Sequence, residues 1–201
     1  MDQLIDNTEK IFDKIKIQLS EGVKNRQHGF HTPIFSNLKK DGCISSRIVV
    51  LRKFNSSKMK INFHSDIRSK KIQEVRLKPE TNFLFYDPKI KIQLRLNTFS
   101  TIHHNDNVAL IAWNQTQLLS RKCYLTESAP SSLSKIATDG LPKHLQGTDP
   151  SKKESEKGYI NFSVISNRIK QIEWLYLSSS GHRRLLININ SKKQIYNWLI
   201  P

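Results

Sequence analysis

Short runs of β-branched and aromatic residues, separated by turn-forming residues, recur along most of the sequence and constrain its fold more than any other feature. Such runs are typical of β-strands, and their short connections favour antiparallel pairing. The sequence has no Gly-rich strand-to-helix turn and no P-loop, which argues against a Rossmann fold. We expect strands at residues 30–35, 44–54, 59–64, 81–86, 90–103, 159–165, 169–177, 183–189 and 195–200.

Apolar residues at helical spacing predict helices at residues 3–21, within 65–80 and at 106–122. Gly22 is expected to stop the first helix. Ser65 or Asp66 is expected to cap the second, and Pro79 to end it. Antiparallel strands with two or three helices predict a mainly β (α+β) fold, with a closed or partly closed β-barrel and helices at its flank.

The length of 201 residues fits one domain with a single core. Residues 126–158 are rich in Ser, Thr, Pro, Gly and Lys and are predicted to form a mobile loop. No apolar run is long enough to span a membrane, and the first twenty residues carry charges, so we expect a cytoplasmic protein. Cys43 and Cys123 lack metal-ligand spacing, so we expect them to be reduced packing residues and expect no metal site.

The charge balance indicates that the protein binds an anion. Lys and Arg number 33 against 17 Asp and Glu, a formal net charge of +16. Nucleic acid, a phosphorylated cofactor and a phosphorylated substrate would all suit this charge, and so would no specific partner, because net charge governs solubility and association rather than fold. A surface that binds nucleic acid stacks bases on aromatic side chains placed among basic ones. The Trp and Tyr residues of this sequence are not interleaved with the basic runs, which argues against such a surface.

Residues 64–71 (HSDIRSKK) are the first candidate for an anion site. They place hydroxyls and cations on the first turns of a predicted helix, where free backbone amides and the helix dipole favour phosphate. A solvated basic helix face is the alternative. The strand at 47–52 (RIVVLR) carries two further cations, but regular alternation would put Arg47 and Arg52 on opposite faces.

Taken in order, four segments resemble the pyridoxamine 5′-phosphate oxidase family of FMN-binding split barrels, in its branch of unassigned substrate. They are residues 47–52, residues 64–71, residues 93–95, and the closing pattern of 173–174, 181–184 and 198–201. The resemblance spans residues 30–122 and 159–201. It implies an antiparallel split β-barrel with flanking helices, as a single FMN-binding domain over residues 1–201.

The resemblance also implies which residues hold FMN. The residues expected at the phosphate and ribityl chain are Arg47, Ser65, Ser69, Lys70 and Lys71. The backbone of residues 48–50 is expected to lie along the flavin. Because the family's site crosses a homodimer interface, Trp174 and Arg184 are expected to come from the partner subunit. Arg52 and His182 are the implied substrate contacts. The full set of implied cofactor contacts is Arg47, Ile48, Val49, Val50, Arg52, His64, Ser65, Ser69, Lys70, Lys71, Gln93, Trp174 and Arg184.

The function implied is an FMN-binding oxidoreductase that transfers a hydride through flavin N5, with an unknown substrate and no assigned catalytic residue. Pyridoxamine or pyridoxine 5′-phosphate oxidation is the alternative within the family. Ser180 stands where those oxidases carry a substrate-binding Arg, and Arg121 is the one stand-in for their substrate-phosphate residues. A split barrel that uses haem or a deazaflavin, and a non-enzymatic basic module that binds nucleic acid, are the remaining alternatives.

Overall fold

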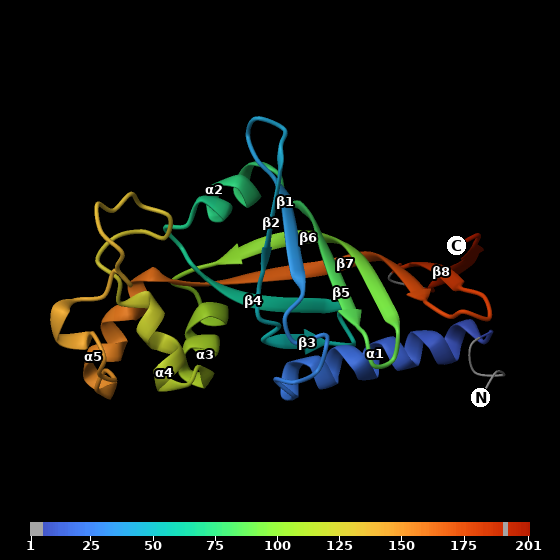
Figure 1. Ribbon diagram of the computed structural model, residues 1–201, viewed down its shortest axis with the longest axis horizontal. Coiled ribbons are helices and arrows are strands. Elements are labelled where there is room, and N and C mark those ends of the chain that lie inside the picture. Colours follow the sequence, from blue (N-terminus) through green and yellow to red (C-terminus); the bar gives the residue numbers. More distant parts are fainter. Residues whose placement is uncertain (1–5, 191–192) are drawn as a thin grey trace.

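The computed structural model describes residues 6–190 and 193–201, and an antiparallel β-sheet runs through the middle of the molecule (Figure 1). Its strand order is β2-β1-β5-β6-β7-β4-β3, and β8 and β9 extend it beyond β7. The strands are β1 (Ile34–Leu38), β2 (Ile44–Ile48), β3 (Lys53–Asn55), β4 (Lys60–Asp66), β5 (Glu80–Asp87), β6 (Ile92–His103), β7 (Phe162–Tyr176), β8 (Arg183–Asn188) and β9 (Ile195–Leu199). The sheet does not close, because β2 and β3 are its unpaired edges within the described ranges. The predicted fold class, a mainly β split barrel with flanking helices, is confirmed.

The helices lie around this sheet (Figure 1). They are α1 (Thr8–Lys24), α2 (Lys70–Leu77), α3 (Asn107–Gln115), α4 (Leu118–Arg121) and α5 (Lys152–Glu156), with short 3-10 turns at Lys122–Tyr124, Lys143–Leu145 and Lys157–Asn161. Gly22 does not stop α1, which continues for two more residues. A Cβ at Gly22 would lie 2.9 Å from the Cβ of Phe30, so this glycine allows the helix and the following segment to touch. Residues 3–5 of the predicted helix lie outside the described ranges.

The strand expected at 44–54 is divided into β2 and β3. Between them, the amide of Val49 donates to the carbonyl of Pro33, and the amide of Arg52 donates to the carbonyl of Asn62. The chain therefore passes from one edge of the sheet to the other within residues 49–52. Arg47 and Arg52 belong to separate parts of the structure, so strand alternation does not relate their side chains.

The start of α2 corrects the predicted cap at Ser65 or Asp66. β4 continues through Asp66, which pairs with Phe162 of β7, and the N-cap of α2 is Ser69. The strand persists because its ladder with β7 supplies the hydrogen bonds that a helix would otherwise provide. The predicted helix at 106–122 is likewise interrupted after Gln115, and α4 follows as a separate turn.

The C-terminal half is organised by β7, one strand where the sequence predicted two. It pairs with β4, β6 and β8 and so joins both halves of the sheet. Residues 126–158 contain no strand, but they include α5, and Leu145 within them is buried. The mobility of this segment stays a prediction.

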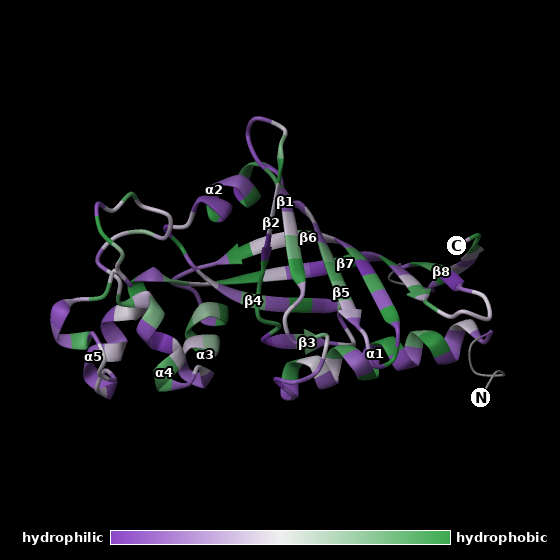
Figure 2. Cartoon of the chain, in the orientation of Figure 1, coloured by the Kyte–Doolittle hydropathy of each residue, from purple (hydrophilic) through white to green (hydrophobic). Residues whose placement is uncertain are grey.

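Two hydrophobic cores hold the elements together. The larger lies between the curved sheet and α1, where strand residues alternate between buried and exposed (Figure 2). The smaller packs α3 and the turn around Tyr124 onto the start of β7, and Trp113 and Phe162 are at its centre. Within residues 6–190 and 193–201, no helix is long and apolar enough to cross a membrane. The same ranges hold no group of three His, Cys, Asp or Glu side chains placed to bind a metal.

Candidate functional site

Four of the side chains expected at the FMN phosphate converge where β4 ends and α2 begins; we call Arg47, Ser65, Ser69 and Lys71 the phosphate cluster. The Lys71 ammonium donates to the hydroxyl of Ser65 at 3.0 Å and to the hydroxyl of Ser69 at 3.2 Å. The two hydroxyl oxygens lie 3.2 Å apart, and both serines are buried. Arg47 comes from β2 and brings a second cation to the group.

The N-terminus of α2 adds to this cluster. Ser69 is the N-cap, but its hydroxyl donates back to the carbonyl of Asp66 at 2.8 Å instead of capping the helix. The first turn contains no acidic residue. Uncapped amides and the positive end of the helix dipole therefore face the same region as the two cations, an arrangement that favours an anion.

Arg47 is held in one orientation by its neighbours. It donates to the Asn37 amide oxygen and to the Ser45 hydroxyl, and its guanidinium lies 5.5 Å from the centre of the Phe35 ring. Its Nη2 is 3.9 Å from a carboxylate oxygen of Glu74. Burial lowers the pKa of Arg47, yet guanidinium remains charged in proteins. A fixed, charged fork of donors suits a phosphate oxygen pair.

The lowered pKa of Lys71 indicates that a bound anion would be favourable in the cluster. Burial lowers the pKa of Lys71, and the nearby positive charge of Arg47 lowers it further, although Asp66 and Glu74 oppose these effects. An added phosphate dianion would relieve both the desolvation and the repulsion. The residues present therefore fit a phosphate group.

Two basic residues of the same segment do not join the cluster. Lys70 is exposed, because it precedes Lys71 by one residue and so lies on another side of α2. Arg68 pairs with Asp66 at 2.7 Å and donates to the carbonyl of Thr126 at 3.1 Å, so it ties the 126–158 segment to β4.

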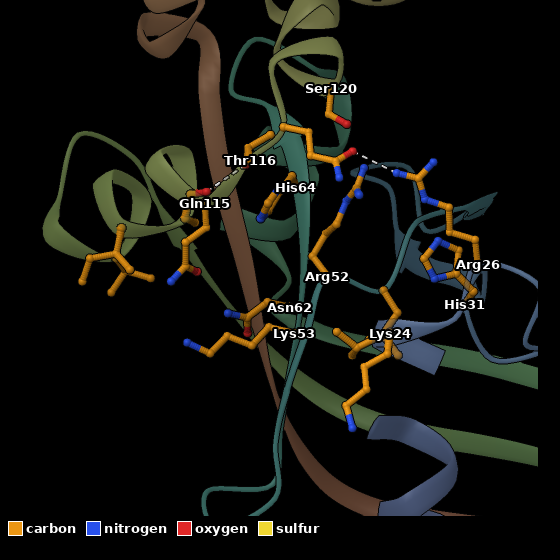
Figure 3. Close-up of a pocket in the computed structure, with 16 residues that line it drawn as sticks. Lys24, Arg26, His31, Arg52, Lys53, Asn62, His64, Gln115, Thr116 and Ser120 are labelled. Carbon is orange, nitrogen blue, oxygen red and sulfur yellow. Dashed lines mark hydrogen bonds between the residues drawn. The ribbon is translucent and has the colours of Figure 1, made fainter. Parts of the chain in front are cut away.

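A cavity of about 400 Å³ lies between the end of α1, the β3–β4 hairpin and the helices α3 and α4 (Figure 3). Arg52 and His64 both line it. Strand alternation puts His64 on the face of β4 opposite to Ser65, so neighbouring residues serve the cavity and the phosphate cluster. Residues 48–50 connect Arg47 of the cluster to the cavity wall. The cavity is lined by Val23, Lys24, Arg26, His31, Leu51, Arg52, Lys53, Asn62, His64, Val108, Ile111, Ala112, Gln115, Thr116, Gln117 and Ser120.

The polar lining of the cavity is basic. It includes Lys24, Arg26, Arg52 and Lys53, and none of the described residues around it is an Asp or Glu. Burial, followed by the positive charge of Arg52, lowers the pKa of His64 to about 4. Its ring is neutral at pH 7 and can exchange hydrogen bonds with a ligand without carrying charge.

Gln93, an implied cofactor contact, and Arg184, which is expected from a partner subunit, lie elsewhere. Gln93, Leu175 and Arg184 are cross-strand neighbours on β6, β7 and β8 and share one face. Arg184 donates to the Glu173 carboxylate at 2.8 Å. Figure 1 shows β8 at the right-hand end of the molecule, away from α2. One chain therefore does not bring Gln93 or Arg184 to the phosphate cluster.

Trp174, which is expected to contact the partner's cofactor, is buried in the core of its own chain. Only 4% of its surface is exposed, and it pairs with Leu94 and Leu185, which are both in the core. Alternation along β7 turns Leu175, rather than Trp174, toward Gln93 and Arg184. In the sequence, the apolar residues at positions 172 and 174 already indicated that Trp174 is on the buried face of this strand.

His182 and Arg121, the other residues considered for substrate, take different positions. His182 is exposed in the turn between β7 and β8, where its Nδ1 accepts from the amide of Ser178 at 3.0 Å. Arg121 is buried and lies outside the cavity. It stacks 4.6 Å from the Trp113 ring and pairs with Glu156 at 2.5 Å. The structure thus gives Arg121 a role in packing, and its contacts do not support the expected role as a stand-in for a substrate-binding residue.

Several residues near the site were missed in the sequence. Asn37 and Glu74 contact Arg47 from β1 and α2. Arg26, after α1, donates to the amide oxygen of Gln117 at 2.9 Å across the cavity (Figure 3). Asn37 is on the same buried face of β1 as Phe35, and Asn is uncommon at such a position. This was the one feature of the sequence that could have indicated its role near the site.

Comparisons with known proteins agree with this fold. Residues 13–104 match the family model described as "Pyridoxamine 5′-phosphate oxidase, FMN-binding domain". A pyridoxamine 5′-phosphate oxidase-related, FMN-binding protein of Nostoc punctiforme is 17% identical with a TM-score of 0.74, over 94% of this chain and 96% of that one. PhzG of Burkholderia lata, solved with tetrahydrophenazine-1-carboxylic acid, is 14% identical with a TM-score of 0.74, over 100% and 97% of the two chains. The comparison with curated proteins found no match.

The fold is that of a split barrel, and residues 13–104 are similar to an FMN-binding domain. The resemblance to the pyridoxamine 5′-phosphate oxidase family that the sequence predicted is confirmed.

Proposed function

We propose that the protein is a homodimeric FMN-dependent oxidoreductase that acts on a small anionic molecule. The observation that carries this proposal is the convergence of Arg47, Ser65, Ser69 and Lys71 at the uncapped start of α2. It occurs inside the segment that matches an FMN-binding domain model. When bound, the flavin supplies a hydride acceptor and donor at its N5 atom.

The chain's own residues bind and orient the cofactor in this proposal. Arg47 and Lys71 neutralise the phosphate, and the hydroxyls of Ser65 and Ser69, which donate to the Asp66 carbonyl in this structure, rotate to donate to its oxygens. Residues 48–50 line the path from the phosphate cluster to the cavity, where apolar side chains exclude water from the flavin.

The cavity is the proposed substrate site. Arg52 and the other cations of its wall attract a carboxylate or phosphate, while Leu51, Val108 and Ile111 contact an apolar part of the same molecule. His64 stays neutral and exchanges a hydrogen bond with the substrate. We give His64 no proton-carrying role, because the pKa of about 4 makes it a weak base at pH 7.

A second copy of the chain is proposed to complete the site with Gln93 and Arg184. Their separation from the phosphate cluster within one chain supports this assignment, as does the exposure of Ile34 and Ile48 on neighbouring strands. Light scattering after size-exclusion chromatography should give twice the chain mass of 23.4 kDa, and a monomer that binds FMN with full affinity would contradict the dimer. The cytoplasmic location and the lack of a specific nucleic-acid partner stay predictions from the sequence.

Oxidation of pyridoxamine or pyridoxine 5′-phosphate is the second candidate. The basic cavity favours it, because the same cations would hold a substrate phosphate. The test is to add either compound to the flavin-loaded protein in the absence of oxygen and to follow reduction of the flavin by its absorbance. Reduction supports this activity, and no reduction favours activity on another anion.

The cofactor is tested by the absorption spectrum of the purified protein and by its melting temperature with added ligands. A ligand that binds only the folded state stabilises it by mass action. We expect a flavin spectrum, or a rise in melting temperature with FMN that exceeds the rise with riboflavin. A rise with haem or a deazaflavin and none with FMN would overturn the proposal.

A further inference from the structure

We propose that Asn37 and Glu74 are positioning residues that hold Arg47 in the orientation needed for the cofactor phosphate. This inference rests on the proposed FMN function. The three side chains form a chain of contacts across β1, β2 and α2. Glu74 binds Asn37, Asn37 binds Arg47, and neither Asn37 nor Glu74 belongs to the phosphate cluster itself.

The amide of Asn37 has its two ends fixed by different partners. Its Nδ2 donates to a Glu74 carboxylate oxygen at 2.8 Å and to the carbonyl of Leu38 at 3.1 Å. Both of these partners only accept, so the amide oxygen is left to accept from Arg47. Asn37 is 3% exposed, so its amide is shielded from most of the solvent. Glu74, together with the Leu38 carbonyl, therefore determines which end of the Asn37 amide faces Arg47.

The position of Arg47 follows from this arrangement. Asn37 is the cross-strand partner of Ser45, and both accept hydrogen bonds from the guanidinium. Phe35 is the cross-strand partner of Arg47, and its ring packs against the guanidinium. The remaining donors of the guanidinium are available for a phosphate without a search over rotamers, which lowers the entropic cost of binding.

Glu74 has two opposing effects on an anion. As an acceptor it orients Asn37, and as a negative charge it repels a phosphate beside Arg47. Glu74→Gln separates these effects, since the Gln side-chain oxygen can still accept from Asn37 while the charge is removed. Glu74→Ala removes both effects. A positioning role predicts that Gln and Ala at this residue change FMN affinity in different directions.

The test is a fluorescence-quenching titration of FMN and of riboflavin, which lacks the phosphate, into the full-length protein and its variants. Asn37→Ala and Glu74→Ala should each weaken FMN by about tenfold, the effect of one hydrogen bond to a charged group. Riboflavin affinity should stay within about twofold, because the fold and the flavin contacts are kept. Glu74→Gln should bind FMN at least as tightly as the wild type. Asn114→Ala, at an exposed position of α3, is the matched control and should change neither ligand.

A double-mutant cycle with Arg47→Ala tests whether Asn37 acts through Arg47. Asn37→Ala should weaken FMN no further once Arg47 is absent. A wild type that prefers FMN over riboflavin, with Asn37→Ala and Glu74→Ala keeping that preference, would overturn the positioning role alone. Equal losses for Glu74→Gln and Glu74→Ala would overturn it too. A wild type without any preference for FMN would overturn the proposed function as well. If Asn37→Ala does not fold, the two Glu74 variants carry the test.

Discussion

The ammonium group of Lys71 lies 3.0 Å from the hydroxyl of Ser65, so the side chain of a helical residue turns back to the strand that precedes its helix. The same group reaches Ser69 at 3.2 Å. Lys70, one residue earlier, is exposed. Of two adjacent lysines with the same charge, one is thus placed to bind a phosphate and the other is solvated.

Replacing Lys71 with Ala should weaken FMN by about ten- to a hundredfold, because a hydrogen bond to a charged group contributes about 1.5–3 kcal/mol. Riboflavin should bind nearly as before. Lys70→Ala is the matched control and should leave both affinities unchanged. Calorimetric titration of the two variants measures this, and equal losses from both lysines would contradict the placement of the cluster.

FMN affinity should decrease as the pH rises into the alkaline range. Burial and the charge of Arg47 lower the pKa of Lys71 from its ordinary value of 10.5, so the free protein loses this charge at a lower pH than an exposed lysine does. The phosphate favours the charged form, so binding takes up a proton once the pH exceeds that pKa. Dissociation constants measured from pH 7 to 10 should rise for the wild type and stay flat for Lys71→Ala. Parallel curves for the two proteins would be the contrary result.

His64 should make the protein less stable in mild acid. Its pKa is about 4 in the folded state, against 6.5 for an unperturbed histidine, so the unfolded chain takes up the proton first. Stability linked to His64 is therefore complete above pH 6.5 and is lost as the pH falls toward 4, by up to about 3 kcal/mol. In urea unfolding at pH 7 and 4.5, His64→Gln should lose less stability than the wild type on acidification. His144→Gln, at an exposed residue, should behave as the wild type does.

Arg121 should contribute to stability and not to ligand binding. It stacks on Trp113, pairs with Glu156, and donates to the carbonyls of Trp113 and Thr116 at 2.8 and 3.1 Å. Arg121→Met should lower the free energy of unfolding by about 2–3 kcal/mol, since it removes the ion pair with Glu156 and two hydrogen bonds from a buried side chain, and takes the guanidinium donor away from the Thr116 carbonyl. FMN affinity should not change. Arg76→Met, at an exposed site, is the control in the same urea titration; a normal midpoint with lost flavin binding in Arg121→Met would contradict this role.

The strands and the phosphate cluster could be predicted because both depend on local sequence. Runs of β-branched residues between turns predict strands, and Ser69 and Lys71 lie within one short segment at a helix start. The division of the 44–54 strand could not be predicted in this way. It results from pairing of Val49 and Arg52 with residues of other segments, which no local pattern encodes.

Tertiary structure explains why Asn37 and Glu74 were missed and why Trp174 is buried. Asn37 and Glu74 are 37 positions apart and become partners only when α2 packs near β1. Trp174 is an implied cofactor contact only because of the resemblance to the family. The alternation of side chains along β7 decides which of Trp174 and Leu175 faces outward. Long-range contacts and the phase of a strand come from tertiary structure, and they determine which candidate residues share a site.

The central claim is that the phosphate of FMN binds at Arg47, Ser65, Ser69 and Lys71. A crystal structure of the protein grown with FMN tests it most directly. We predict phosphate oxygens within hydrogen-bonding distance of the Lys71 ammonium and of both serine hydroxyls, with the flavin along residues 48–50. A phosphate bound instead among the cations of the cavity, or a flavin that leaves the start of α2 untouched, would contradict the claim.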